Sequence, residues 1–447
     1  MPMTPRRRVL LAATIPLVLV STGCSYLSGG GSAADPGSAD CKAFSDWQGH
    51  DGKTVEIYAS IRDEEGERMQ EAWQKFSDCT GITIKYEGSA EFEAQIQVRV
   101  DGGNAPDIAF FPQPGLLERF AAAGDAKPLP DTVRKRAEDG YPKDWLSYAT
   151  HDGEMYGTPL GANVKSLVWY SPKLFAEEGY EVPKTWDALI KLSDSMADTD
   201  VKPWCAGIES GEATGWPATD WVENVMLREN GPEVYDQWVA HEIPFDDPKV
   251  EKALDRVDGI WRNPDYVNAG FGDVKSIVTT SSQDAGLPVA EQKCGMHLMG
   301  TFYAANWSED TEIAEDGDVF AFNLPPIDES VGTPVLGGGE FTAAFAERPE
   351  VVAVQEYLAT VDYADRRAQA GSWFSAHQDL DLKALKNPND RLAAELLRDP
   401  DTVFRWDGAD IMPAAVGSGT FWKGMTNWLN GDDTGEVLTY VEKSWPE

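Results

Sequence analysis

Apolar residues between positions 53 and 111 switch repeatedly from a period of two to a helical period, and this pattern limits the fold more than any other feature. It predicts a strand over 53–59, a helix over 64–79, a strand over 82–86, a helix over 92–100 and a strand over 108–111. Such a βαβαβ order predicts an α/β fold with a mostly parallel sheet and helices on both faces.

The loops after these strands are the first candidates for a binding site. In open parallel sheets, ligands bind beyond the carboxyl ends of the strands. This rule selects residues 60–64, 87–90 and 112–115, each of which has polar groups able to face a ligand. Arg62 and Asp63 are the candidates in the first loop.

A second candidate is the stretch 203–227, in which tryptophans, carboxylates and glycines lie between a short apolar strand and a helix. A sugar presents flat C–H faces that suit an aromatic ring, and hydroxyls that need hydrogen-bond partners. Trp216 suits this role because it starts a helix just before a proline, although a core position fits it equally well. Trp221 has apolar neighbours at helical spacing and is expected in the core. Glu209 and Asp220 are the expected acceptors, whose charged hydrogen bonds contribute about 1.5–3 kcal/mol each.

The rest of the chain continues the alternation of strands and helices. A helix that begins at Trp186 is capped by Thr185, and residues 294–306 are expected to form a buried strand followed by an aromatic turn. Further helices are predicted over 248–262, 351–360 and 436–444.

The charge of the chain is strongly negative. It has 38 basic and 75 acidic residues, which give a formal net charge of −37. Such a surface repels nucleic acid and anionic lipid headgroups, and no basic stripe offsets it. The hydrophobic fraction of 42% is too high for a disordered acidic chain, so we expect a globular protein with more than one domain.

Residues 1–23 have the pattern of an export signal, with arginines followed by an apolar run that is too short to span a bilayer. The run ends in VSTGC, which resembles the lipobox of bacterial lipoproteins and implies that Cys24 is lipidated. An ordinary cleaved signal peptide with a chance cysteine is the alternative. Residues 24–40 are rich in glycine, serine and alanine and should form a flexible tether. The expected location is therefore the extracytoplasmic face of the cell membrane, with a lipid anchor.

Four cysteines, Cys41, Cys79, Cys205 and Cys294, remain once the lipobox cysteine is set aside, and an even count outside the cytoplasm indicates disulfides. The first two flank the first strand and helix, and the last two lie in short apolar strands. We favour the pairs 41–79 and 205–294, although the sequence permits three pairings. The cysteine spacing fits no zinc motif and the five histidines form no cluster, so neither a metal nor a cofactor is expected.

Several motifs occur along the chain in an order that is more specific than any one of them. They are GNAPDIAFF, YGTPLGANVKSLVWY, PKTWD, GIESGEATGWPATDWVENVML, LGGGEF and IMPAAVGSGTFWKGMTNWL. This series resembles the extracellular solute-binding proteins of ABC sugar importers, and it is most similar to their alpha-glucoside-binding branch. The resemblance covers nearly all of residues 42–447.

The resemblance implies a two-lobed, periplasmic-binding-protein-like fold of type II with three crossovers between the lobes. It would place 41–164 and 333–372 in an N-terminal lobe, and 165–326 and 373–447 in a C-terminal lobe. Periodicity alone does not predict this interleaving, but the proline and glycine content of 325–339 is typical of connecting segments.

The resemblance also implies residues of the cleft. Asn163, beside the first crossover, is expected to hydrogen-bond sugar hydroxyls, although it could equally be a plain loop asparagine. Phe111 and Gln113 are expected to form an aromatic platform and its polar partner. Trp422 is favoured as a second platform, with a core position as the alternative. Tyr303 stands with Phe302 in the turn where maltose-binding relatives carry a stacking tryptophan.

Two further groups are candidates by their own chemistry. Gly339 and Glu340 end a glycine run that lacks the Gly-Lys-Ser ending of a P-loop. The glycine is expected to let the backbone approach an uncharged ligand, while the carboxylate accepts its hydroxyls. Arg405 and Asp407 offer a bidentate donor and an acceptor, and they either bind ligand or pair with each other across a loop.

The expected function is capture of an alpha-glucoside or an oligosaccharide by hinge closure, followed by delivery to the permease subunits of an ABC importer. The protein is expected to be a monomer and not an enzyme. A lipid-anchored glycoside hydrolase is the alternative, because paired carboxylates and aromatic rings also serve glycosidases. A surface adhesin, the third possibility, predicts no binding of small molecules.

Overall fold

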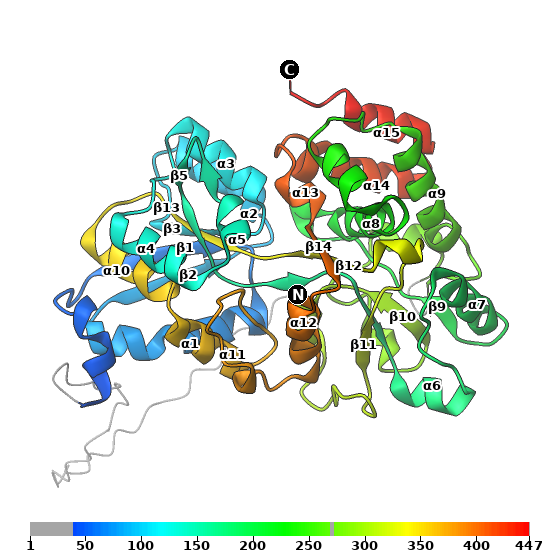
Figure 1. The fold of residues 1–447 in the computed structure, drawn as a ribbon, viewed down its shortest axis with the longest axis horizontal. Coiled ribbons are helices and arrows are strands. Elements are labelled where there is room, and N and C mark those ends of the chain that lie inside the picture. Colours follow the sequence, from blue (N-terminus) through cyan, green and yellow to red (C-terminus); the bar gives the residue numbers. More distant parts are fainter. Residues whose placement is uncertain (1–38, 269–271, 447) are drawn as a thin grey trace, which may run out of the picture.

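The computed structural model describes residues 39–268 and 272–446, which fold into two lobes joined by extended strands (Figure 1). Each lobe has a β-sheet with helices packed against it, as the α/β prediction requires. The predicted signal peptide 1–23, the lipidation site Cys24 and almost all of the tether 24–40 lie outside the described residues.

The strands of the first sheet are β1 (Thr54–Ala59), β2 (Thr83–Gly88), β3 (Ile108–Phe111), β6 (Gly157–Pro159) and β13 (Phe341–Ala344). Their order is β2-β1-β3-β13-β6. β1 runs parallel to β2 and β3, which confirms the predicted βαβαβ unit. β13 is antiparallel to β3 and β6, so later parts of the chain complete this sheet.

The helices of the first lobe are α1 (Asp63–Thr80), α2 (Phe92–Asp101), α3 (Pro114–Ala123), α4 (Asp131–Gly140), α5 (Lys143–Ser147), α10 (Pro349–Leu358) and α11 (Val361–Ala370). Trp73 of α1 lies 5.8 Å from Tyr86 on one face of the sheet. Phe92 of α2 lies 5.2 Å from Tyr58, whose side chain points to the other face. Helices therefore cover both faces, as predicted.

The prediction that Phe111 forms a sugar platform is wrong. Its side chain is fully buried, 5.7 Å from Phe92 of α2 and 5.6 Å from Phe120 of α3. Alternation along β3 turns this ring toward the helices and not toward the end of the strand. Phe111 is therefore part of the hydrophobic core.

The strands of the second sheet are β8 (Leu167–Tyr170), β9 (Lys202–Trp204), β10 (Cys294–Leu298) and β11 (Phe320–Asn323), in the order β11-β8-β10-β9. The helices packed around them are α6 (Pro172–Glu178), α7 (Trp186–Ala197), α8 (Trp216–Val239), α9 (Pro248–Trp261), α13 (Gly408–Ile411), α14 (Trp422–Asn430) and α15 (Thr434–Glu442). The predicted cap of α7 is present, because Thr185 Oγ1 accepts a hydrogen bond from the backbone N–H of Ala188.

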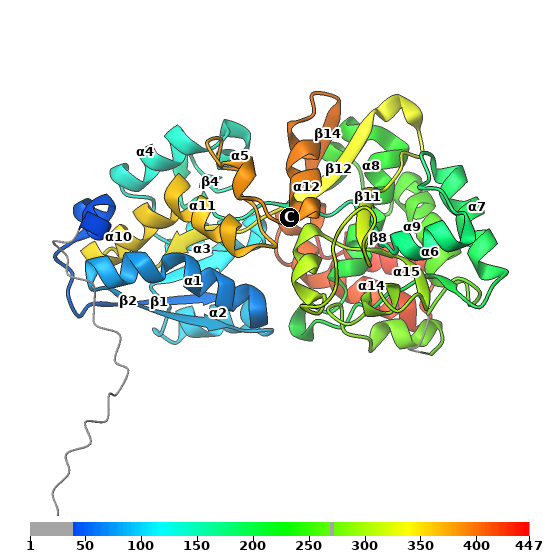
Figure 2. The same ribbon diagram turned by 90° about the horizontal axis from the view of Figure 1, so that it is seen from below.

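The connections between the lobes pair with one another in a small sheet of order β14-β12-β7. Its strands are β7 (Asn163–Val164), β12 (Thr333–Gly338) and β14 (Thr402–Trp406), the last of which follows α12 (Pro388–Arg398). Seen from below, β12 and β14 lie against the second lobe (Figure 2). The chain is thus interleaved as the resemblance implies, while the residue limits of the two lobes stay a prediction.

Short elements complete the described part of the chain. A hairpin consists of β4 (Thr150–His151) and β5 (Glu154–Met155). Short 3₁₀ helices occur at Ala39–Trp47, Gly211–Ala213, Val274–Val278, Leu287–Val289, Thr301–Asn306, Glu329–Val331 and Leu382–Ala384, and a π-helical turn at Val416–Phe421. None of the helices in the described ranges combines the length and apolar character needed to cross a bilayer.

Both favoured disulfide pairings are present in the structure. Cys41 is bonded to Cys79 and Cys205 to Cys294, with Cα–Cα distances of 5.2 and 5.9 Å. The first bond ties the N-terminal 3₁₀ helix to the end of α1. The second ties the residue after β9 to the start of β10.

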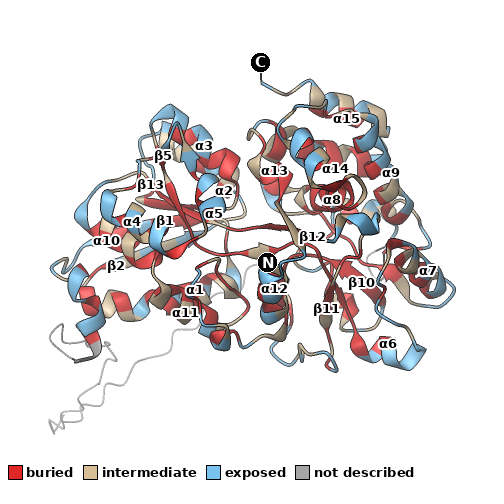
Figure 3. Cartoon of the chain, viewed as in Figure 1, coloured by how far each residue is buried: buried red, intermediate tan, exposed pale blue. Residues whose placement is uncertain are grey.

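Trp221 provides a test of the core of the second lobe, where buried residues fill the inner faces of the helices (Figure 3). Its ring is 2% exposed and makes edge contacts with Trp204 at 5.0 Å and Trp261 at 5.8 Å. Trp221→Ala should therefore lower the free energy of unfolding by about 3–5 kcal/mol. Denaturant unfolding followed by circular dichroism measures this loss, and a loss below about 1 kcal/mol would contradict the core assignment.

Candidate functional site

A pocket of about 240 Å³ lies between the two lobes. The first lobe contributes residues 60–65 after β1, Ala90 and Glu93 after β2, and Pro112 with Gln113 after β3. These are the carboxyl ends of neighbouring parallel strands, where sheets of this type bind ligands. The loops predicted from the strand ends thus meet at one pocket.

The other walls come from the second lobe and from the connections. The second lobe contributes Ser210, Ala213, Trp216, Ser282, Gln283, Met299, Phe302, Tyr303, Ala305, Asn306 and Trp422. The connections and the segment after β14 contribute Asn163, Lys165, Gly339, Glu340 and Asp410.

The lobes also touch each other around this pocket. Gln283 Nε2 donates to the Asp63 carboxylate across the cleft at 3.5 Å. Gly211 lies so close to the opposite lobe that a Cβ atom there would be 3.1 Å from the carbonyl oxygen of Ala90. The structure therefore describes lobes that close over the pocket.

Aromatic rings gather on the side of the second lobe. Trp216 begins α8, where the following proline suits the first helical turn, and its ring centre lies 5.9 Å from that of Phe302. Trp422 begins α14 and is 3% exposed, and its Nε1 has no hydrogen-bond partner in the described part of the chain. The partly exposed ring of Trp216 offers an apolar face and the unused N–H of the buried Trp422 offers a donor, and a sugar could use both.

Tyr303 has a structural role within the same turn. Its hydroxyl donates to the carbonyl oxygen of Gln283 at 2.8 Å and accepts from the backbone N–H of Gly286 at 2.7 Å. Since both bonds are made within the protein, Tyr303 fixes the loop that carries Gln283. Phe302 is the more exposed ring of the pair.

Amides and carboxyl groups make up the polar side of the pocket. Gln113 Nε2 donates to Glu93 at 3.2 Å, while its Oε1 is buried without a partner among the described residues. Asn163 Nδ2 donates to Glu340 at 3.4 Å. These contacts hold the side chains in place and leave acceptor capacity for a ligand.

Three carboxyl groups in the pocket have raised pKa values. Burial raises the pKa of Glu65 to about 7, against the lowering effect of the nearby Arg367 charge. Burial also raises the pKa of Glu93 and of Glu340, with partial opposition from the hydrogen bonds that each accepts. With a pKa of about 7, Glu65 is partly protonated at neutral pH, so it can donate to a ligand hydroxyl as well as accept from one.

Beside the pocket, Lys165 lies among buried carboxylates. Its Nζ donates to Asp407, and lies 3.4 Å from Asp220 and 3.3 Å from Asp410. Although burial favours the neutral amine, these carboxylates outweigh it and raise the pKa of Lys165. Burial would raise the pKa of Asp407, but the lysine charge lowers it below the usual value. The ammonium group and Asp407 therefore form an ion pair.

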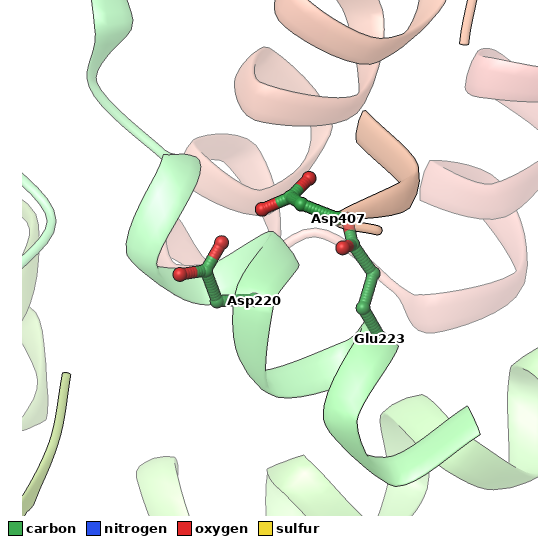
Figure 4. Close-up of side chains that lie close together, drawn as sticks. All are labelled: Asp220, Glu223 and Asp407. Carbon is green, nitrogen blue, oxygen red and sulfur yellow. The ribbon is translucent and has the colours of Figure 1, made fainter. Parts of the chain in front are cut away.

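Glu223 completes this cluster and points toward Asp220 and Asp407 (Figure 4). Its two oxygens accept from the backbone N–H groups of Gly408 and Ala409, at 2.8 and 3.0 Å. Carboxylate oxygens of Asp220, Glu223 and Asp407 lie within 4.8 Å of one another, close enough in principle for a cation. Here Lys165 and backbone N–H groups supply the positive charge and the donors, so the cluster is satisfied by the protein itself.

Nine of the predicted ligand-binding residues border the pocket. They are Arg62, Asp63, Gln113, Asn163, Trp216, Tyr303, Gly339, Glu340 and Trp422. Phe302, considered beside Tyr303, borders it too. Their contacts with a ligand stay a prediction.

The structure places the remaining candidates elsewhere. Asp220 and Asp407 do not line the pocket, because both are buried against Lys165. Glu209 turns back to accept from the backbone N–H of Gly211 at 2.9 Å, so it shapes its own loop.

Arg405 and Asp407 do not pair with each other, and Arg405 does not reach the pocket. Its guanidinium group forms a bidentate pair with Asp236, at 2.6 and 2.8 Å, beside a different groove behind the connections. Arg405 lies within β14, whereas Asp407 follows the strand and caps α13 by accepting from the backbone N–H of Asp410, so the two side chains have different partners.

Sequence reasoning missed Lys165, Asp410, Glu65 and Glu93. A signal existed for the two glutamates, because each lies in the first turn of a helix that follows a selected loop. Lys165 lies only two positions after Asn163 in the same connection. No local signal pointed to Asp410, whose role depends on a contact with a residue 245 positions away.

Residues 59–361 match the family described as bacterial extracellular solute-binding protein. This match covers well over half of the chain. The chain belongs to this family. The pocket between the lobes is the candidate solute site.

Curated relatives of this solute-binding protein match along most of their length. The osmoprotective compounds-binding protein GgtB of Synechocystis sp. is 41% identical over 399 residues, which are 89% of this chain and 93% of that protein. The alpha-glucosides-binding periplasmic protein AglE of Rhizobium meliloti is 36% identical over 411 residues, 89% of this chain and 88% of that protein.

Solved structures confirm the type of fold. The solute receptor AcbH, described as preferring b-D-galactopyranose, has a TM-score of 0.75 at 20% identity and covers 88% of this chain and 98% of its own. Maltose-bound MalE3 of T. maritima has a TM-score of 0.69 at 14% identity, with coverage of 88% and 98%. The two-lobed type II fold of the solute-binding protein is thus confirmed.

The Lys165 cluster predicts a large effect of removing one charge. Lys165→Met should lower the free energy of unfolding by about 3–5 kcal/mol, because it leaves buried carboxylates without their cation. The pKa of Asp407 in the folded protein lies below the unfolded value of 3.8, so its ionised form stabilises the fold at pH values above 3.8. This contribution disappears when the lysine is replaced. Asp407 must then take up a proton to stay buried, so the loss should be larger at pH 8 than at pH 5.

Denaturant unfolding at both pH values measures this effect, and Lys173→Met is the matched control. Lys173 pairs with Asp318 at 2.6 Å on the surface and is 48% exposed, so its loss should hardly change the free energy of unfolding. Equal losses for the two variants, or a Lys165→Met loss independent of pH, would contradict the buried ion pair.

Proposed function

We propose that this solute-binding protein captures a small neutral sugar, with alpha-glucosides as the first choice, and delivers it to the permease subunits of an ABC importer. One observation carries the proposal: the pocket has aromatic rings on the side of the second lobe and carboxyl and amide groups on the side of the first. A sugar ring offers an apolar face and a rim of hydroxyls, so it can satisfy both sides at once.

The size and charge of the pocket favour a small, uncharged ligand. Its volume of about 240 Å³ lies just below the usual range of about 300–1,000 Å³ for small-molecule sites, which suits one or two sugar rings. Carboxyl groups outnumber basic groups in its lining, where Arg62 and Lys165 are the basic side chains and Lys165 is already paired with its own carboxylates. This balance disfavours an anionic sugar.

The curated relatives support this choice through the ligands in their names, which are alpha-glucosides in one case and osmoprotective compounds in the other. We further propose that the protein acts as a monomer, held at the extracytoplasmic face of the membrane by a lipid on Cys24. The VSTGC sequence supports the anchor.

Binding would work by closure of the lobes around the sugar. A ligand in this pocket contacts both lobes and the connections, so it stabilises the closed form over any form in which the walls are apart. Micromolar affinity, about −8 kcal/mol, would suffice for capture.

Calorimetry with maltose, trehalose, sucrose and glycine betaine tests the proposal, with release of reducing sugar assayed on the same samples. Saturable binding of a glucoside without hydrolysis supports it. Binding of glycine betaine alone would refute a sugar ligand, and turnover would support the glycoside hydrolase instead.

Trp216 provides the sharpest test of the aromatic wall. Trp216→Ala should weaken binding of the sugar by about tenfold or more, because a stacked ring contributes upward of about 1 kcal/mol. It should change the free energy of unfolding little, since the ring is partly exposed. Trp445→Ala is the control, as that ring is also partly exposed but stacks on His241, away from the pocket. Equal affinities of the two variants would contradict this role.

A further inference from the structure

Beside the pocket, Gly115 of α3 lies directly against the backbone of the second lobe. A Cβ atom on Gly115 would overlap the carbonyl oxygen of Met412 and lie 3.4 Å from that of Asp410. Met412 follows α13 and is buried in the hydrophobic core of the second lobe. Because the facing atoms belong to the backbone, they cannot move aside as a flexible side chain would.

The conformation of Gly115 does not by itself require glycine. It lies in the first turn of a regular helix and is not among the residues with positive φ. Alanine is normally more favourable than glycine inside a helix. The reason for glycine at this position is therefore the close approach of the other lobe.

In each lobe, the residue two positions before this contact lines the pocket. Gln113, two positions before Gly115, belongs to the wall of the first lobe, and Asp410, two positions before Met412, to the opposite wall. Both neighbours are buried, and Gln113 Oε1 has no partner within the described ranges. The spacing at Gly115 consequently determines the spacing of the two walls.

We infer that Gly115 is a positioning residue for ligand capture, because the absence of a side chain lets the lobes close until both walls reach the same ligand. This inference rests on the proposed function, capture by closure. A methyl group at this position would hold the lobes apart and leave the fold of each lobe intact.

Gly115→Ala tests the inference, with Gly259→Ala as the matched control. Gly259 lies within α9, and a Cβ atom there would meet nothing within 4 Å. Both variants add one methyl group to a helix, but only the first directs it at the other lobe. In calorimetry with the panel sugar that the wild type binds, Gly115→Ala should bind about tenfold more weakly or worse, and Gly259→Ala as the wild type does.

A second measurement reports closure without any ligand. Asp63 and Gln283 meet across the cleft, so a short bifunctional thiol reagent can bridge the cysteines of the double variant Asp63→Cys, Gln283→Cys when the lobes are closed. Introducing Gly115→Ala into this double variant should slow the cross-linking about tenfold. Introducing Gly259→Ala instead should leave the rate unchanged.

Each outcome decides a separate question. Equal cross-linking rates for the two glycine variants would overturn the inference. A lower melting temperature for ligand-free Gly115→Ala than for the wild type would also overturn the inference. Gly115 would then contact the second lobe whether or not the lobes close. Slow cross-linking of Gly115→Ala combined with no sugar binding by the wild type would support the inference and refute the proposed sugar ligand.

Discussion

A single buried ammonium group connects the segments that run between the lobes. Lys165 lies just after β7, and its carboxylate partners come from α8 and from the segment after β14. So many charges can be buried together only if each is paired or neutralised. The lysine keeps Asp407 ionised, whereas burial, together with the neighbouring negative charges, raises the pKa of Asp220, Glu223 and Asp410. The ends of β7 and β14 are thereby held to the second lobe.

This arrangement explains how the pocket is divided. Lys165 and Asp410 form part of its wall and are held by the cluster, and the Lys165 ammonium also lies 5.4 Å from the ring of Trp216. The aromatic wall and the charged cluster therefore form one rigid unit with α8. The loops after β1, β2 and β3 belong to the other lobe and bring their carboxyl and amide groups to it. A ligand gains its full set of contacts only when the two units meet.

The periodic pattern predicts the βαβαβ unit and the loops at its strand ends, because these features depend on neighbouring residues. The family resemblance misplaced Phe111, because β3 is buried on both faces and its ring belongs to the core. The chemistry of Arg405 and Asp407 did not predict their partners, because these residues are close in sequence but meet Asp236 and Lys165 in different places. The partners of Lys165 lie 55, 242 and 245 positions away, so only the folded chain brings the cluster together.

The charge of the whole chain and the chemistry of the pocket both disfavour anionic ligands. A net charge of −37 produces a negative potential around the molecule, which lowers the local concentration of anions before any contact is made. Inside the pocket, burial raises the pKa of Glu65, Glu93 and Glu340, so these carboxyl groups favour their neutral form more than exposed ones do. An anion bound there would oppose this effect by placing a negative charge beside Asp410 and these carboxyl groups. Neutral, hydroxyl-rich solutes are therefore favoured twice, first during approach and again when the lobes close.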